Sequence, residues 1–241
     1  MAAELMSLPK AERLANNVRL HEELYRRVPD HPLLTTKRSS AARAVLVARE
    51  KQLLLTWLKP GDVFLELGAG DCAVSFAIAG IASKVYGLDL HDKIARDNQP
   101  ANFELVISDG VSVPASGVNL AYSNQLIEHI HPEDALEQLA NTHAALAPGG
   151  VYVCNTPNRL TGPHDISRHF DKVATGFHLH EYTIRELAGI FRKRFRRVTW
   201  VVKSGLELPT WVGVLYECVI SAVPKRLRKR LPLPTQVAGY R

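Results

Sequence analysis

The chain has 241 residues, 46% of them hydrophobic and 22% charged, and its net charge is +6. This length and composition predict one α/β domain with an ample core and flanking helices. The three cysteines, Cys72, Cys154 and Cys218, have no disulfide or metal-ligand spacing, which excludes a disulfide framework and indicates a reducing, cytoplasmic compartment. No run of 18 apolar residues occurs, so we expect no membrane-spanning helix.

Two helices are predicted ahead of the first strand. Apolar residues at helical spacing mark residues 10–28, where Pro29 ends the helix, and a second helix is predicted to end at Leu58. We expect three parts along the chain: an N-terminal helical cap over residues 1–58, a central domain over residues 59–205 and an apolar, basic C-terminal extension over residues 206–241.

A buried strand that enters a glycine turn is predicted at residues 63–71. Strand-forming residues surround one acid, Glu66, and Gly68 and Gly70 then allow a tight turn and a close approach of the backbone to a ligand. Glu66 is expected at the carboxyl end of the strand, where ligands bind in open α/β sheets, and a buried carboxylate there needs donors. The glycines also fit a looser dinucleotide-binding fingerprint. This stretch alone is therefore compatible with a nucleotide cofactor and with a purely structural turn that binds no ligand.

Strands and helices then alternate, and a polar residue ends each strand. Further strands are predicted at residues 84–89, 103–108, 118–123 and 151–154, which favours a doubly wound, mostly parallel sheet. Asp89 at the tip of the second strand can accept both hydroxyls of a ribose. The alternative for Asp89 is an N-cap of a helix over residues 91–98.

A long loop is predicted over residues 155–181, and it holds four of the ten histidines: His164, His169, His178 and His180. Loops of this length inside a compact domain tend to be functional or mobile. Thr183 and Glu186 form a capping box that opens the next helix, and a sixth strand is predicted at residues 198–202.

Seven motifs follow one another along the chain: Glu66-x-Gly68-x-Gly70, Tyr86-Gly87-Leu88-Asp89, Ser108-Asp109-Gly110, Ser123-Asn124-Gln125-Leu126-Ile127-Glu128-His129, Leu146-Ala147-Pro148-Gly149-Gly150, Asn155-Thr156-Pro157-Asn158 and His180-Glu181-Tyr182-Thr183. Together they resemble the class I S-adenosylmethionine-dependent methyltransferases of the small-molecule type, over roughly residues 58–200. The resemblance implies a Rossmann-like sheet of seven, or six, strands with helices on both faces. It also implies S-adenosyl-L-methionine as the cofactor in place of a dinucleotide.

The resemblance further implies nine cofactor-binding residues: Glu66, Gly68, Ala69, Gly70, Asp89, Leu90, Asp109, Gly110 and Asn124. Glu66 would receive the amino end of the cofactor, Asp89 the ribose hydroxyls and Asp109 the adenine amino group. Asn124 would sit under the sulfonium end. Three carboxylates at strand tips suit a cofactor that has many donors and a positive sulfur.

Methyl transfer is an in-line displacement with a good leaving group, so positioning does most of the work and only a weakly acidic hydroxyl needs a base. His129, His178 and His180 are the candidates for this base, and the alternative for each is an ordinary structural histidine. Some quinone O-methyltransferases and small-RNA 2′-O-methyltransferases carry Glu-x-x-Glu-His at this place and bind a divalent ion. Gln125 replaces the first acid in this chain, so we expect no bound metal.

The positive charge is concentrated near the C-terminus. Residues 191–230 hold eleven Lys and Arg against two acids, a net +9, whereas the remainder carries −3. Within that segment an apolar run, Trp211 to Val223, precedes a basic cluster, Lys225 to Arg230, as in interfacial helices that bind anionic lipid. The alternative is a core helix followed by a basic tail.

These features predict O-methylation of a small-molecule, lipid- or sugar-linked acceptor by a cytoplasmic protein that binds peripherally at the inner membrane face. The alternatives are an RNA methyltransferase and a non-catalytic S-adenosylmethionine-binding protein. The fourth strand ends in Ser123-Asn124-Gln125 and lacks the Asn/Asp-Pro-Pro-aromatic motif of amino-directed DNA and RNA methyltransferases, so we expect no nucleic-acid partner.

Overall fold

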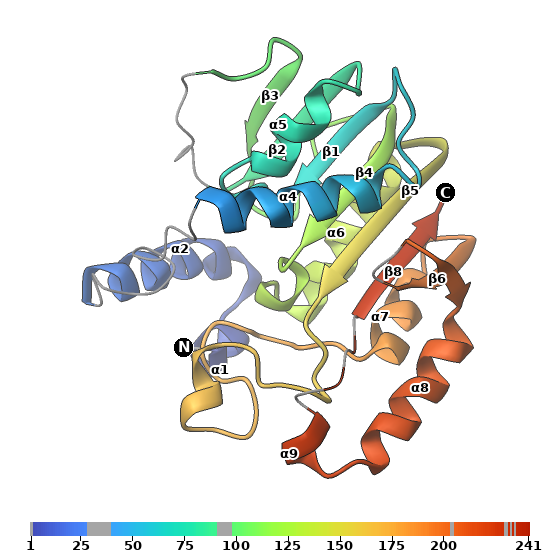
Figure 1. Cartoon of the computed structure of the whole chain (residues 1–241). Coiled ribbons are helices and arrows are strands. Elements are labelled where there is room, and N and C mark those ends of the chain that lie inside the picture. The colour runs from blue at the N-terminus through green and yellow to red at the C-terminus, as the bar shows by residue number, and fades with distance from the viewer. Residues whose placement is uncertain are drawn as a thin grey trace.

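An eight-stranded sheet lies at the centre of the described fold, with the strand order β3-β2-β1-β4-β5-β8-β6-β7 (Figure 1). The computed structural model describes residues 2–27, 40–90, 98–202, 205–228, 231, 233 and 235–241. The strands are β1 (Val63–Leu67), β2 (Lys84–Asp89), β3 (Phe103–Ile107), β4 (Val118–Asn124), β5 (Leu146–Thr156), β6 (Arg197–Val201), β7 (Glu207–Pro209) and β8 (Thr235–Tyr240).

The first five strands are parallel, and the remaining three are antiparallel to their neighbours. The doubly wound, mostly parallel sheet is therefore confirmed, with one strand more than the predicted seven, because the short β7 pairs with the edge of β6. Parallel pairing places the carboxyl ends of β1, β2, β3 and β4 at one edge, which is where the polar residues that end these strands lie.

The described helices are α1 (Ala2–Ser7), α2 (Lys10–Arg27), α4 (Ser40–Leu54), α5 (Ala73–Ala79), α6 (Pro132–Ala145), α7 (Ile184–Phe191), α8 (Thr210–Ala222) and α9 (Lys225–Arg228), with short 3₁₀ turns η1 (Ile127–His129) and η2 (Ile166–His169). Cys72, the residue before α5, has a left-handed backbone with φ 51°, so the helix begins only at Ala73. The helix considered for residues 91–98 lies almost entirely outside the described residues. None of the described helices is long and apolar enough to cross a bilayer.

Alternating strand residues build one apolar core on each face of the sheet. On one face Phe64 and Leu120 pack with α4 and α5, whereas on the other Leu65 and Tyr152 pack with α6 and α7. Helices therefore cover both faces, as expected. Because side chains of a strand alternate between faces, both cores require the nearly continuous apolar runs that the sequence has in β1, β4 and β5.

Residues 206–241, which the sequence marked as an extension, contribute two strands to the sheet. β8 lies between β5 and β6 and pairs with both along most of its length. The C-terminal segment is thus an integral part of the fold, and α8 packs against Trp200 of β6 and Ile184 of α7 through Ile220 and Tyr216.

Candidate active site

The glycine turn after β1 forms the floor of the site. Gly68 and Gly70 have left-handed backbones with φ of 68° and 54°, which side chains rarely allow. A Cβ atom on Gly68 would lie 3.0 Å from the side chain of Leu126, so the turn is closely covered there. The Gly70 N–H donates to Oδ2 of Asp89 at 2.8 Å, which ties the tip of β2 to the turn after β1.

A cavity of about 400 Å³ opens beside this turn, and its lining combines apolar side chains with a few polar groups: Leu67, Gly68, Leu88, Asp89, Leu90, Ser108, Gly110, Ser112, Leu126 and Gln138. Four of the nine predicted cofactor residues are in this set, namely Gly68, Asp89, Leu90 and Gly110. A mostly apolar space with one carboxylate in its lining suits an aromatic base joined to a ribose.

Glu66 lies behind the turn and is buried, with 6% of its surface exposed. Its Oε2 accepts hydrogen bonds from the Ser75 backbone N–H at 3.0 Å and from the Ser75 hydroxyl at 2.5 Å. Burial raises the pKa of Glu66 to about 8 against the opposing effect of these hydrogen bonds. Glu66 does not line the cavity, so its place is beneath the cofactor turn.

Asp109 and Asn124 also lie outside the cavity lining. The Asp109 carboxylate accepts from the backbone N–H groups of Val111 and Ser112 and from the Ser112 hydroxyl, so it closes its own turn. Burial would raise the pKa of Asp109, but these bonds outweigh it and lower the pKa. Asn124 donates to Glu50 of α4 at 3.1 Å and accepts from Asn155 of β5 at 2.7 Å.

Helix α4 therefore closes over the end of the sheet. Besides the contact of Glu50, Arg43 makes a paired ion bridge to Asp71, with N–O distances of 2.9 and 2.5 Å. Burial acts to raise the pKa of Asp71, but the bonds from Arg43 prevail and lower it. The sequence predicted that the N-terminal helices form a cap. It did not predict the contacts of Arg43 and Glu50, because nothing in the local pattern of α4 distinguishes these two residues.

The structure brings two of the three candidate catalytic histidines together. The rings of His129 in η1 and His178 in the loop over residues 155–181 lie 4.8 Å apart, centre to centre, and are nearly perpendicular. The loop is held there by the N–H groups of Leu179 and His180, which donate to the carbonyl oxygen of Glu128. His180 itself points elsewhere: its ring packs on Tyr182, and its Nε2 lies 3.8 Å from the Glu186 carboxylate.

Two acids accompany this histidine pair. Glu181 accepts from, or shares a proton with, Nδ1 of His178 at 2.8 Å. Burial acts to lower the pKa of His178, but the bond to Glu181 and the nearby charge of Glu128 raise it overall. Glu128 is fully buried, and burial raises its pKa to about 7. Both acids belong to motifs that the sequence contains, but only the folding of the loop onto η1 shows that they share a site.

A second cavity, of about 470 Å³, lies within the loop beside His178. Its lining includes two cations as well as histidines and one acid: Arg159, Pro163, Lys172, Val173, Ala174, His178, Leu179, His180 and Glu181. Both cavities adjoin η1, because Leu126, the residue before it, lines the first and the loop that packs on Glu128 lines the second.

Comparisons with known proteins agree with this geometry. A family model described as a methyltransferase domain matches residues 40–194. A protein of Mycolicibacterium smegmatis, described as a probable S-adenosylmethionine-dependent methyltransferase, is 27% identical over 171 residues; the match covers 69% of this chain and 60% of that relative's length.

Solved structures share the fold at low sequence identity. A SAM-dependent methyltransferase from Archaeoglobus fulgidus superposes with a TM-score of 0.58 at 18% identity, over 88% of this chain and all of the other. Phosphoethanolamine N-methyltransferase 1 of Haemonchus contortus, solved with phosphoethanolamine and S-adenosylhomocysteine, gives a TM-score of 0.59 at 17% identity, over 82% of this chain and 46% of the other.

Proposed function

This chain belongs to the S-adenosylmethionine-dependent methyltransferases, and from that premise we propose that it methylates an oxygen atom of a lipid-linked acceptor at an anionic membrane surface. The cofactor follows from the family. The acceptor class and the surface are our inference, drawn from the histidine pair, the second cavity and the outer face of α8.

The cavity at the ends of β1 and β2 is the place we assign to the cofactor. Asp89 at its rim would hold the ribose hydroxyls, and the apolar walls from Leu88 and Leu90 would cover the adenine. The sulfonium end would then point towards η1, where Leu126 and the histidine pair lie. This orientation directs the methyl group to the side of the site that holds the second cavity.

The second cavity is the place we assign to the acceptor. Arg159 and Lys172 give it two cations, which suit an anionic group such as a phosphate or a carboxylate. His178 lines this cavity, so its ring would be the one to receive a proton from a hydroxyl bound there. An acceptor with an anionic group and a hydroxyl a few atoms away would match both features.

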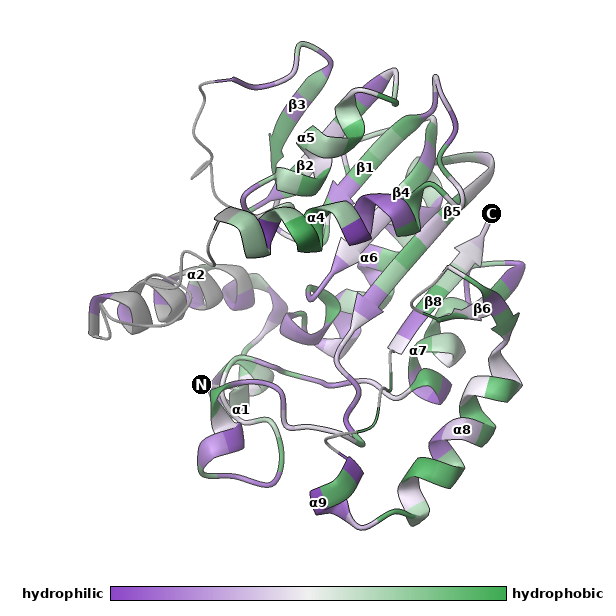
Figure 2. Ribbon diagram, viewed as in Figure 1, coloured by the Kyte–Doolittle hydropathy of each residue, from purple (hydrophilic) through white to green (hydrophobic). Residues whose placement is uncertain are grey.

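The observation that carries the lipid assignment is an apolar stripe on the exposed side of α8. Trp211, Leu215 and Val219 recur every four residues and are 63%, 56% and 64% exposed. Residues at this spacing lie on one face of a helix. Figure 2 shows apolar residues along α8 and hydrophilic ones on α9, whose sequence is Lys-Arg-Leu-Arg.

The stripe is connected to the acceptor loop. On α9 the Lys225 ammonium donates to the carbonyl oxygen of Lys172 at 2.8 Å, so the basic helix rests on the loop that lines the second cavity. Phe170 and Val173 of the same loop are 73% and 60% exposed. Apolar side chains beside basic ones complement the acyl chains and anionic headgroups of a bilayer.

Sedimentation with lipid vesicles tests the surface. We expect the protein to bind phosphatidylglycerol vesicles at low salt, to be released by 0.5 M salt, and to lose at least tenfold in binding when Leu215 and Val219 are changed to Ser. The matched control changes two other exposed apolar residues, Val45 on α4 and Leu55 in the turn directly after it, to Ser and should bind as the wild type does. Equal binding by the two double variants would contradict the proposal.

The acceptor is tested by methyl transfer from labelled S-adenosylmethionine. We expect label in the organic phase of a lipid extract, attached through a base-stable ether or a base-labile ester, and little in phenols or free sugars. Label recovered only in RNA would instead favour the alternative function and would contradict a lipid-linked acceptor.

A further inference from the structure

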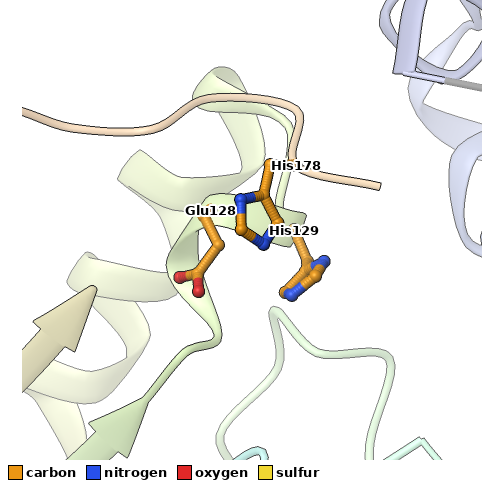
Figure 3. A group of neighbouring side chains, drawn as sticks. All are labelled: Glu128, His129 and His178. Atoms are coloured by element: carbon orange, nitrogen blue, oxygen red, sulfur yellow. The ribbon is translucent and has the colours of Figure 1, made fainter. Parts of the chain in front are cut away.

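Three buried side-chain atoms have no hydrogen-bond partner among the described residues: Oε1 of Glu128, Oε1 of Gln138 and Nε2 of Gln236. A buried polar atom without a partner is costly, and native proteins rarely keep one without a functional reason. Glu128 lies beside the histidine pair (Figure 3), and Gln236 lies on β8. Gln138 of α6 lines the cavity that we assign to the cofactor, so a bound cofactor is in a position to satisfy its oxygen.

Hydrogen bonding fixes the orientation of the Gln138 amide. Its Nε2 donates to the carbonyl oxygen of Gly110 at 2.5 Å, and a carbonyl oxygen can only accept. The reverse orientation would place two acceptor oxygens against each other, so the nitrogen faces Gly110 and the oxygen faces away from it. Gln138 is fully buried, so no solvent reaches Oε1 to replace the missing donor.

The wall of the cavity next to Gln138 is the turn that follows β3. Gly110 and Ser112 of this turn line the same cavity as Gln138. Asn141, one turn further along α6, donates from Nδ2 to the carbonyl oxygen of Val111 at 3.0 Å. Two amides of α6 therefore hold this turn, and Gln138 is fixed in the wall before any ligand binds.

The acid that was expected to bind the adenine amino group is already occupied. Oδ1 of Asp109 accepts from the backbone N–H groups of Val111 and Ser112 at 2.9 and 2.5 Å, and Oδ2 accepts from the Ser112 hydroxyl at 2.9 Å. Asp109 is also absent from the cavity lining. An amino group buried in this cavity needs an acceptor, because burying an unpaired donor is costly.

We propose that Gln138 recognises the adenine base of S-adenosylmethionine, with its Oε1 accepting a hydrogen bond from the 6-amino group. The inference rests on the place that we assign to the cofactor. Because Nε2 is held by Gly110, Gln138 offers the ligand an acceptor only. A purine without the amino group leaves this oxygen unpaired, so Gln138 selects for adenine.

Calorimetric titration with two ligands isolates this bond: S-adenosylhomocysteine, and its analogue with hydrogen in place of the 6-amino group. We expect the wild-type chain to bind the analogue at least tenfold more weakly, because the buried oxygen then stays unpaired. Gln138→Met removes the acceptor at similar volume, so the two ligands should bind within about threefold of each other. Asn141→Leu is the matched control, since it removes the neighbouring amide bond to the same turn and should keep the preference of at least tenfold.

Equal affinity of the wild-type chain for the two ligands, or a tenfold preference that persists in Gln138→Met, would overturn the role of Gln138. Asp109→Asn decides the matter independently of how Gln138→Met folds: its preference should remain at least tenfold, and loss of the preference would assign the amino group to Asp109 instead. A wild-type chain that binds neither ligand would refute the cofactor site and the role of Gln138 together. The oxygen acceptor and the membrane surface do not enter this measurement, so they are judged separately.

Discussion

The fold strongly changes the ionisation of the Glu66 carboxyl. Its pKa is about 8 in the folded chain because of burial, against roughly 4.3 in an unfolded one. Between these values the folded state holds the proton and the unfolded state does not, so stability falls as pH rises through this range.

We therefore predict that the cofactor-free protein loses on the order of a few kcal/mol of unfolding free energy between pH 5 and pH 9. Glu66→Gln keeps an acceptor for Ser75 and cannot ionise, so its stability should change much less over the same range. Urea unfolding at several pH values measures both slopes. Parallel slopes for the two proteins would show that Glu66 does not hold the proton.

The sequence predicted the positions of some site residues and not of others. Gly70 and Asp89 lie at adjacent strand ends in any parallel sheet, and the structure joins them by a hydrogen bond. Asp109 was expected to face a ligand, but its oxygens accept bonds from its own turn, a local competition that the motif does not reveal. The pairing of His178 with His129 depends on how a long loop packs, which no local pattern encodes.

Among the elements, β8 shows the clearest limit of local reasoning. Its residues were assigned to a C-terminal extension, yet β8 lies between β5 and β6 in the sheet. Strand periodicity and the Thr183–Glu186 capping box are local signals. The strands predicted from periodicity are present, and so is the helix that the capping box opens. The order of strands in space is a long-range property, so the insertion of β8 could not be read from its sequence.

Gly239 of β8 tests this packing. A Cβ atom there would lie 2.7 Å from the Phe195 ring and 2.8 Å from the Phe191 ring, so Gly239→Ala should destabilise the protein by about 1–3 kcal/mol. Gly189→Ala on α7 is the control, since its Cβ meets nothing within 4 Å and should be neutral or stabilise by up to about 1 kcal/mol. Urea unfolding measures both. A Gly239→Ala variant as stable as the wild type would contradict the close packing of β8 on the helix.

At the scale of the whole molecule, the cavity that we assign to the cofactor and the surface that we propose for lipid binding belong to different elements of one fold. The cofactor cavity lies at the ends of the central strands, whereas the apolar stripe and basic residues lie on α8 and α9 at the far end of the sheet (Figure 1). The loop over residues 155–181 connects the two, because it contacts both η1 and Lys225. The sequence showed that the basic residues are concentrated near the C-terminus and that the methyltransferase motifs occur in order. Only the folded loop over residues 155–181 shows that these two parts of the chain are in contact.

The central claim is that S-adenosylmethionine binds at the carboxyl ends of β1 and β2, with its ribose on Asp89. Calorimetric titration of Asp89→Ala tests it most directly, with Glu104→Ala as the control, an exposed acid near the opposite end of the neighbouring strand. Loss of hydrogen bonds to a charged acceptor should weaken cofactor binding by Asp89→Ala about 10–100-fold, while Glu104→Ala binds as the wild type does. Equal affinity of the two variants would contradict the account.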